Sequence, residues 1–136
     1  MRPLPPLLAS WVLVGLYASG IFLLSSLSSP PLMTDMALPH LDKVYHFLEY
    51  AGLTFLLIRA LHVTYPTYPS TRLSLWGFLV AVHYGALDEL HQGAVPGRMM
   101  SVLDMFADVA GASVMAGMWS CVHHRWPILL RQDTYR

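Results

Sequence analysis

The chain has 136 residues, of which 55% are hydrophobic and 12% are charged, and its formal net charge is zero with histidine neutral. The charged fraction is about half the ~25% of an average soluble domain. No basic stripe with interleaved aromatic residues is present, so nucleic acid is not an expected partner. The single Cys121 excludes an internal disulfide and a cysteine-based metal cluster.

Four apolar segments follow one another, and each can cross a bilayer as a helix of about 20 residues if polar residues lie at its ends. We therefore expect an all-α fold: an integral membrane bundle of four transmembrane helices in residues 1–124, with a polar cytoplasmic tail at 125–136. The alternative for the first segment is a cleaved signal peptide, although its apolar run is longer than the usual core of such peptides. The predicted helices are Leu7–Leu27, Lys43–His62, Arg72–Gln92 and Val102–His123.

The connecting segments carry loop, capping and turn signals. Ser25–Pro39 is expected to be a loop, because its prolines disfavour helix at the residues that precede them. Asp42 is a candidate N-cap of the second helix, and Pro96-Gly97 is a turn signal before the fourth. Ser101 is a candidate N-cap of the fourth helix, and Asp104 stands where a capping-box carboxylate would lie.

The distribution of lysine and arginine predicts the orientation, because cytoplasmic loops carry an excess of both residues. With four spans, six of these residues fall on one side of the membrane, and Lys43 and Arg98 fall on the other. This split predicts that both termini lie in the cytoplasm. The six residues on the cytoplasmic side are Arg2, Arg59, Arg72, Arg125, Arg131 and Arg136.

Helical spacing gathers polar side chains at the outer ends of the last three predicted helices, because residues three, four or seven apart share one helix face. We expect these side chains to line one crevice that opens outward. Polar groups are costly in lipid, so such a cluster commonly marks a functional site. The three sets are Asp42, His46 and Glu49; Asp88 with His91 or Gln92; and Ser101, Asp104 and Asp108.

Small residues on the fourth predicted helix are expected to allow close helix packing. A similar face is expected on the first helix. The residues are Ala107, Gly111, Ala112, Ser113, Ala116 and Gly117 on the fourth helix, and Gly15 and Ser19 on the first.

Several short motifs occur in a fixed order along residues 25–117: Asp42-Lys43-Val44-Tyr45-His46, Asp88-Glu89-Leu90-His91-Gln92, Pro96-Gly97-Arg98, Ser101-Val102-Leu103-Asp104, and then Gly111. This pattern resembles the VanZ-like family of small bacterial multi-pass membrane proteins. The resemblance implies a multi-pass protein of the bacterial cell membrane. The founding member of that family is linked to low-level teicoplanin resistance. Asp108 stands where the family often has asparagine, which makes this site more acidic.

Each candidate site residue has a structural alternative. Arg98 either binds a phosphate or carboxylate with its planar fork or pairs with Asp104 or Glu89. His46 either acts as a general base beside a carboxylate or is a capping and interhelix histidine. The expected ligand-binding residues are Asp42, Lys43, His46, Glu49, Glu89, His91, Gln92, Arg98, Asp104 and Asp108, and the catalytic candidates are His46, Glu49, Asp88 and Glu89.

A divalent cation could also bind the acidic cluster, since carboxylates and imidazole are common metal ligands. The spacing matches no dedicated metal motif, and a hydrogen-bonded network neutralised by Lys43 and Arg98 is the simpler interpretation. No cofactor is evident from the sequence. The residues considered for a cation are Asp88, Glu89, His91, Asp104 and Asp108.

Three functions are compatible with the sequence. The first is binding or modification of a cell-envelope component, such as an anionic envelope lipid or a wall precursor, with an effect on glycopeptide susceptibility. The second is a membrane-embedded, metal-assisted enzyme that acts on a phosphate- or ester-bearing lipid. The third is a small cation- or proton-coupled transporter. His83, in the middle of the third helix, is expected to be a buried, hydrogen-bonded histidine rather than a proton relay.

Overall fold

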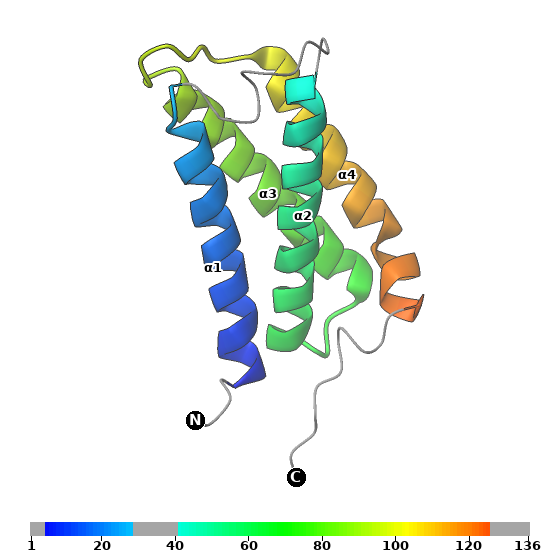
Figure 1. Ribbon diagram of the computed structural model, residues 1–136. Helices are drawn as coiled ribbons and strands as arrows, with labels where there is room; N and C mark the ends of the chain where they lie inside the picture. The colour runs from blue at the N-terminus through cyan, green and yellow to red at the C-terminus, as the bar shows by residue number, and fades with distance from the viewer. Residues whose placement is uncertain (1–4, 29–40, 126–136) are drawn as a thin grey trace.

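The computed structural model describes residues 5–28 and 41–125, and these residues form four helices with no strand among them (Figure 1). The all-α prediction is confirmed, and each helix begins and ends within two residues of its predicted bounds. The helices are α1 (Pro6–Ser25), α2 (Leu41–Thr64), α3 (Ser70–Gln92) and α4 (Val102–Arg125).

The helices run alternately up and down, so the start of α1 and the end of α4 lie at the same end of the bundle (Figure 1). Helix α2 is the central element: it packs against α1, α3 and α4, whereas α1 packs mainly on α2 and only slightly on α3. The apolar core is therefore built around α2. Its buried side chains include Leu53, Leu57 and Ala60 of α2, with Val14 and Ile21 of α1, Ala81 of α3 and Ala112 of α4.

Glycine allows close contact between helices, as Gly111 and Gly77 show. A Cβ atom added to Gly111 of α4 would lie 2.1 Å from the carbonyl oxygen of Phe47 in α2, and one added to Gly77 of α3 would lie 2.5 Å from Cγ1 of Ile58. The predicted close packing of small residues is therefore confirmed at Gly111. It is wrong at Gly117 and Gly15, where an added Cβ would have no neighbouring atom within 4 Å.

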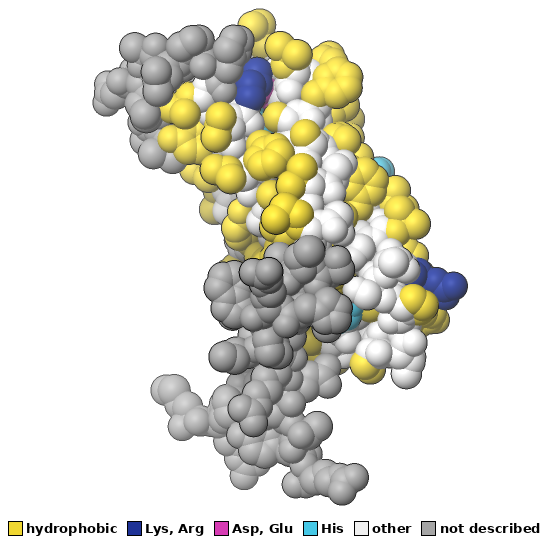
Figure 2. All heavy atoms as spheres, turned by 90° about the vertical axis from the view of Figure 1, so that its right-hand side faces the viewer, with side chains coloured by type: hydrophobic (Ala, Val, Ile, Leu, Met, Phe, Trp, Pro, Cys, Tyr) yellow, Lys and Arg dark blue, Asp and Glu magenta, His cyan; other side chains and the backbone are white. Residues whose placement is uncertain are grey.

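Within the part of the chain that the structure describes, three helices are long and apolar enough to cross a membrane: α1, α2 and residues Val102–Trp119 of α4. Helix α3 does not meet this criterion, because His83 lies in its middle and charged residues lie near both ends. Large hydrophobic side chains are widely exposed, among them Leu16 and Leu23 of α1. Figure 2 shows hydrophobic side chains over much of one face of the bundle and few acidic atoms. Such a surface suits contact with lipid.

The ends of the helices test the capping and turn predictions. Asp42 is not the N-cap of α2, because the helix already begins at Leu41; its carboxylate lies in the first turn, where a negative charge favours the helix dipole. The turn at Pro96-Gly97 is confirmed, with Gly97 at a φ of 82° that favours glycine. Helix α4 extends through Arg125, the first residue of the predicted tail. Most of the predicted loop and the rest of the tail lie outside the described residues.

Candidate functional site

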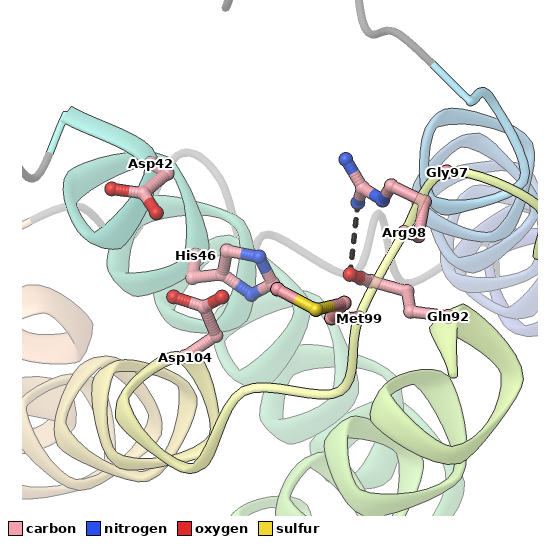
Figure 3. Close-up of a pocket in the computed structure, with 7 residues that line it drawn as sticks. All are labelled: Asp42, His46, Gln92, Gly97, Arg98, Met99 and Asp104. Carbon is pink, nitrogen blue, oxygen red and sulfur yellow. Dashed lines mark hydrogen bonds between the residues drawn. The ribbon is translucent and has the colours of Figure 1, made fainter.

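A polar pocket lies at the end of the bundle where α3 ends and where α2 and α4 begin (Figure 3). Its volume is about 190 Å³, below the ~300–1,000 Å³ of pockets that enclose drug-sized ligands. The pocket therefore has room for part of a headgroup but not for a whole lipid. Its lining residues are Asp42, His46, Gln92, Gly97, Arg98, Met99 and Asp104.

The start of α4, on one side of this pocket, is fixed by the side chain of Ser101, which precedes the helix, and by a side chain of α3. The backbone N–H of Asp104 donates to Oγ of Ser101 at 3.2 Å, so Ser101 is the N-cap as predicted. The N–H of Ser101 donates to Oε2 of Glu89 at 2.7 Å. Glu89 thus takes the place that Asp104 would have in a capping box, and the capping-box prediction for Asp104 is wrong.

Lys43 connects α2 to α4 at the edge of the pocket. Its Nζ donates to Oδ2 of Asp42 at 2.6 Å and also forms an ion pair with Oδ1 of Asp104. One ammonium group therefore neutralises part of the charge of two carboxylates. The predicted neutralising role of Lys43 is confirmed, and Asp104 is held toward α2.

His46 and Asp108 form a buried pair beneath the pocket. Nδ1 of His46 lies 2.9 Å from Oδ1 of Asp108, and both side chains are less than a tenth exposed. An ionised carboxylate only accepts hydrogen bonds, so Nδ1 carries the hydrogen and Nε2 of a neutral ring is an acceptor. Gly85 of α3 makes room for this pair, because an added Cβ would lie 3.1 Å from Oδ2 of Asp108.

A chain of hydrogen bonds runs from α1 across α3 to the pocket. Oγ of Ser25, the last residue of α1, donates to Oδ1 of Asp88 at 2.6 Å. The amide of Gln92 donates to Oδ2 of Asp88 at 3.0 Å, and Oε1 of Gln92 accepts a hydrogen bond from Nη2 of Arg98 at 2.9 Å. The predicted pairing of Asp88 with Gln92 is confirmed. These bonds hold the α1 end, the α3 end and Arg98 in one network.

Arg98 lies across the pocket from the acidic residues. Figure 3 shows its side chain beside Gln92, with Asp42, His46 and Asp104 on the opposite side. Within residues 5–28 and 41–125, the guanidinium pairs with no carboxylate; its bond goes to Gln92. The structural alternative, an ion pair with Asp104 or Glu89, is therefore wrong: Lys43 binds Asp104, and Glu89 accepts the N–H of Ser101.

The remaining predicted residues are distributed around the pocket rather than in it. Glu49 is half-buried, one turn deeper in α2, and lies within electrostatic range of Asp88, Asp108 and Arg98. His91 points toward α1, where its Nε2 lies 2.9 Å from Oγ of Ser26 and its ring stacks on Phe22 at 4.6 Å. His91 is thus placed away from the pocket, in contact with α1.

Sequence reasoning missed two contributors to the site. Met99 lines the pocket, and Ser25 binds Asp88. Met99 follows the Pro96-Gly97-Arg98 turn directly, so its place beside Arg98 could have been inferred from that turn. Ser25 gave no such signal, because it belongs to a serine- and proline-rich stretch that indicated a loop.

The fold and the pocket define a small helical membrane protein with a polar site at one end. Comparison with known families then gives a specific assignment: the VanZ/LLP1 family matches residues 8–123. The chain belongs to this family, as the motifs predicted. Neither the comparison with curated proteins nor the comparison with solved structures gave a match.

Proposed function

We propose that the protein spans the bacterial cell membrane four times, with both termini in the cytoplasm, and that its pocket faces outward and binds an anionic component of the cell envelope. Support for the fourth span comes from α3, which lies beside α2 and α4 along the bundle (Figure 1). At about 1.5 Å per residue, its 23 residues reach about 35 Å, beyond the ~30 Å of a hydrocarbon core.

Arg98 carries the proposal for the ligand. The side chain of an arginine has five N–H donors in a planar fork that suits phosphate and carboxylate. Of the described groups, only the Gln92 amide oxygen accepts from the guanidinium of Arg98, although three carboxylates border or underlie the pocket: Asp42, Asp104 and Asp108. Because the internal network leaves this cation unpaired with those acids, an anionic headgroup is a suitable partner. Lipid phosphates and lipid-linked wall precursors both carry such groups.

The His46–Asp108 pair supports a second function, hydrolysis of a phosphate- or ester-bearing lipid. A carboxylate-oriented imidazole is the common form of a general base, and His46 lines the pocket beside Asp42 and Asp104 (Figure 3). In this function His46 would take a proton from water while Arg98 holds the anionic group.

Transport is not proposed, because the described core below the site is apolar. Leu53, Leu57 and Ala81 occupy the centre, and the buried hydroxyl of Thr54 donates to the carbonyl of Tyr50 in its own helix. His83, expected to be a buried histidine, is exposed on the outer face of α3 instead. It therefore cannot relay protons through the interior of a monomer.

The proposal is tested by lipid-dependent stability in detergent. Phosphatidylglycerol should raise the Tm of the wild-type protein more than phosphatidylcholine does, because ligands that bind the folded state stabilise it. Arg98→Lys keeps the charge but loses the planar fork. Without lipid this variant should have the same Tm as the wild type, and it should lose most of the increase in Tm that phosphatidylglycerol produces. The matched control is Arg72→Lys, at the opposite end of the bundle, where the guanidinium lies over Tyr68.

Two outcomes would contradict the proposal. One is an increase in Tm with phosphatidylglycerol that is as large for Arg98→Lys as for the wild type. The other is an equal increase in the wild-type Tm with phosphatidylglycerol and with phosphatidylcholine. A cellular test of the resistance link runs in parallel. Overexpression of the wild type should lower teicoplanin susceptibility, and Arg98→Lys should not. Failure of the cellular test alone would remove the resistance role and leave ligand binding in place.

A further inference from the structure

The polar end of the bundle holds more negative than positive charge. Among residues 5–28 and 41–125, six carboxyl groups lie in or around the pocket, and only two permanently cationic side chains, Lys43 and Arg98, accompany them. Buried carboxylates without compensation are costly, and an anionic ligand would be repelled by an uncompensated acidic cluster. The six acids are Asp42, Glu49, Asp88, Glu89, Asp104 and Asp108.

Beneath the pocket, three of the buried side chains come together from three helices. His46 of α2, Glu89 of α3 and Asp108 of α4 each offer a nitrogen or oxygen atom, and these atoms lie within 4.8 Å of one another. Their exposed fractions are 5%, 0% and 1%. The packing of three helices brings this set of groups together, so their proximity does not follow from the spacing of residues along one helix.

Two oxygen atoms of this set lack a partner within the described residues. Oε2 of Glu89 accepts the N–H of Ser101, and Oδ1 of Asp108 pairs with His46. The other oxygens, Oε1 of Glu89 and Oδ2 of Asp108, are buried and have no hydrogen-bond partner. Buried polar atoms are almost always satisfied. Each unsatisfied atom in this set therefore calls for a bound group, and two carboxylate oxygens with an imidazole call for a cation.

We propose that His46, Glu89 and Asp108 bind one divalent transition-metal ion. Mixed imidazole and carboxylate ligands suit Zn²⁺ or Mn²⁺ better than Mg²⁺ or Ca²⁺, which prefer oxygen alone. Three protein ligands leave a coordination position open. Since His46 also lines the pocket, that position would be directed to the ligand of the pocket, across from Arg98.

Such an ion would account for anion binding at an acidic site. It neutralises two carboxylates of the set and adds a second positive group opposite Arg98, so that a phosphate or carboxylate headgroup would lie between two cations. The metal proposal extends the proposed function and can be tested separately from it, because metal binding is measured with no lipid present.

The experiment uses tag-free protein in a neutral detergent, stripped with chelator and titrated with Zn²⁺ or Mn²⁺ alone. One equivalent should bind, and the Tm should rise with metal concentration by mass action. Glu89→Gln and Asp108→Asn should lose the bound metal and the metal-dependent rise in Tm. In the absence of metal their Tm should equal or exceed that of the wild type, because each removes a buried negative charge. Asp42→Asn is the matched control: it removes the same charge at the pocket rim and should retain the metal.

If a variant fails to fold, X-ray absorption spectroscopy of the metal-bound wild type can identify the ligands of the ion instead. The ion should have one imidazole and otherwise oxygen ligands. Three results would overturn the proposal: no saturable binding to the wild type; equal binding to wild type, Glu89→Gln and Asp108→Asn, which would indicate an adventitious ion only; or a site with several imidazoles or with sulfur. If metal binds but the phosphatidylglycerol experiment fails, only the anionic ligand is refuted.

Discussion

The contact between Gly111 and Phe47 allows a quantitative test of the packing that positions the site. A Cβ at position 111 would lie 2.1 Å from the Phe47 carbonyl oxygen, and ordinary contact begins at 3.4 Å, so α2 and α4 would have to separate by about 1.3 Å there. The obstructing atom is backbone and cannot rotate away. Overpacking of this kind costs about 1–3 kcal/mol. Asp108 lies one turn before Gly111, so the same displacement would lengthen its 2.9 Å contact with His46.

Gly117→Ala is the matched control, because it makes the same change in the same helix where nothing lies within 4 Å of the added Cβ. Replacement of glycine by alanine inside an exposed helix stabilises by up to about 1 kcal/mol. Because the propensity gain is the same at both positions, the two variants should differ in stability by the overpacking cost, roughly 1–3 kcal/mol, with Gly111→Ala the less stable. Thermal unfolding in one detergent measures the difference. Equal Tm values for the two variants would refute the close approach of α2 and α4.

Three further predictions concern topology and the polar network. In a Cys121→Ser background, Ala94→Cys should react with an impermeant thiol reagent in intact cells and Tyr68→Cys should not; the reverse pattern would overturn the orientation. Ser101→Ala should cost about 1 kcal/mol through loss of the N-cap of α4, measured by chemical or thermal unfolding, and an unchanged stability would contradict the cap. In metal-free protein, His46→Leu should cost about 3–5 kcal/mol because it leaves Asp108 buried without a partner, whereas the double change to leucine at both positions should recover much of that loss. A double variant no more stable than His46→Leu would argue against the pair.

The helices could be predicted from the sequence because their signals are local. Long apolar runs and the prolines between them indicate where the helices begin and end, and the predicted bounds are correct to within two residues. Spacing within α2 and α4 also predicted which residues share a face. In the structure Asp42, His46 and Asp104 line one pocket.

Partners across helices could not be predicted in the same way. Spacing within one helix does not determine how far it is rotated or shifted relative to its neighbours. Spacing left open whether Arg98 pairs with Asp104 or Glu89, whereas in the structure Lys43 of α2 forms the ion pair with Asp104. His83 was expected in the interior, yet the rotation of α3 that brings Asp88 and Glu89 inside leaves His83 on the outer face. These outcomes depend on tertiary packing, which one sequence does not specify.

We propose that Arg98 binds an anionic envelope component in the pocket. Native mass spectrometry of protein extracted from the cell membrane tests it most directly, with wild type, Arg98→Lys and Arg72→Lys compared under one protocol. We expect the wild type and Arg72→Lys to retain a phosphate- or carboxylate-bearing lipid, and Arg98→Lys to release it. A wild type that carries no anionic lipid, or an Arg98→Lys protein that retains it to the same extent, would refute lipid binding through Arg98.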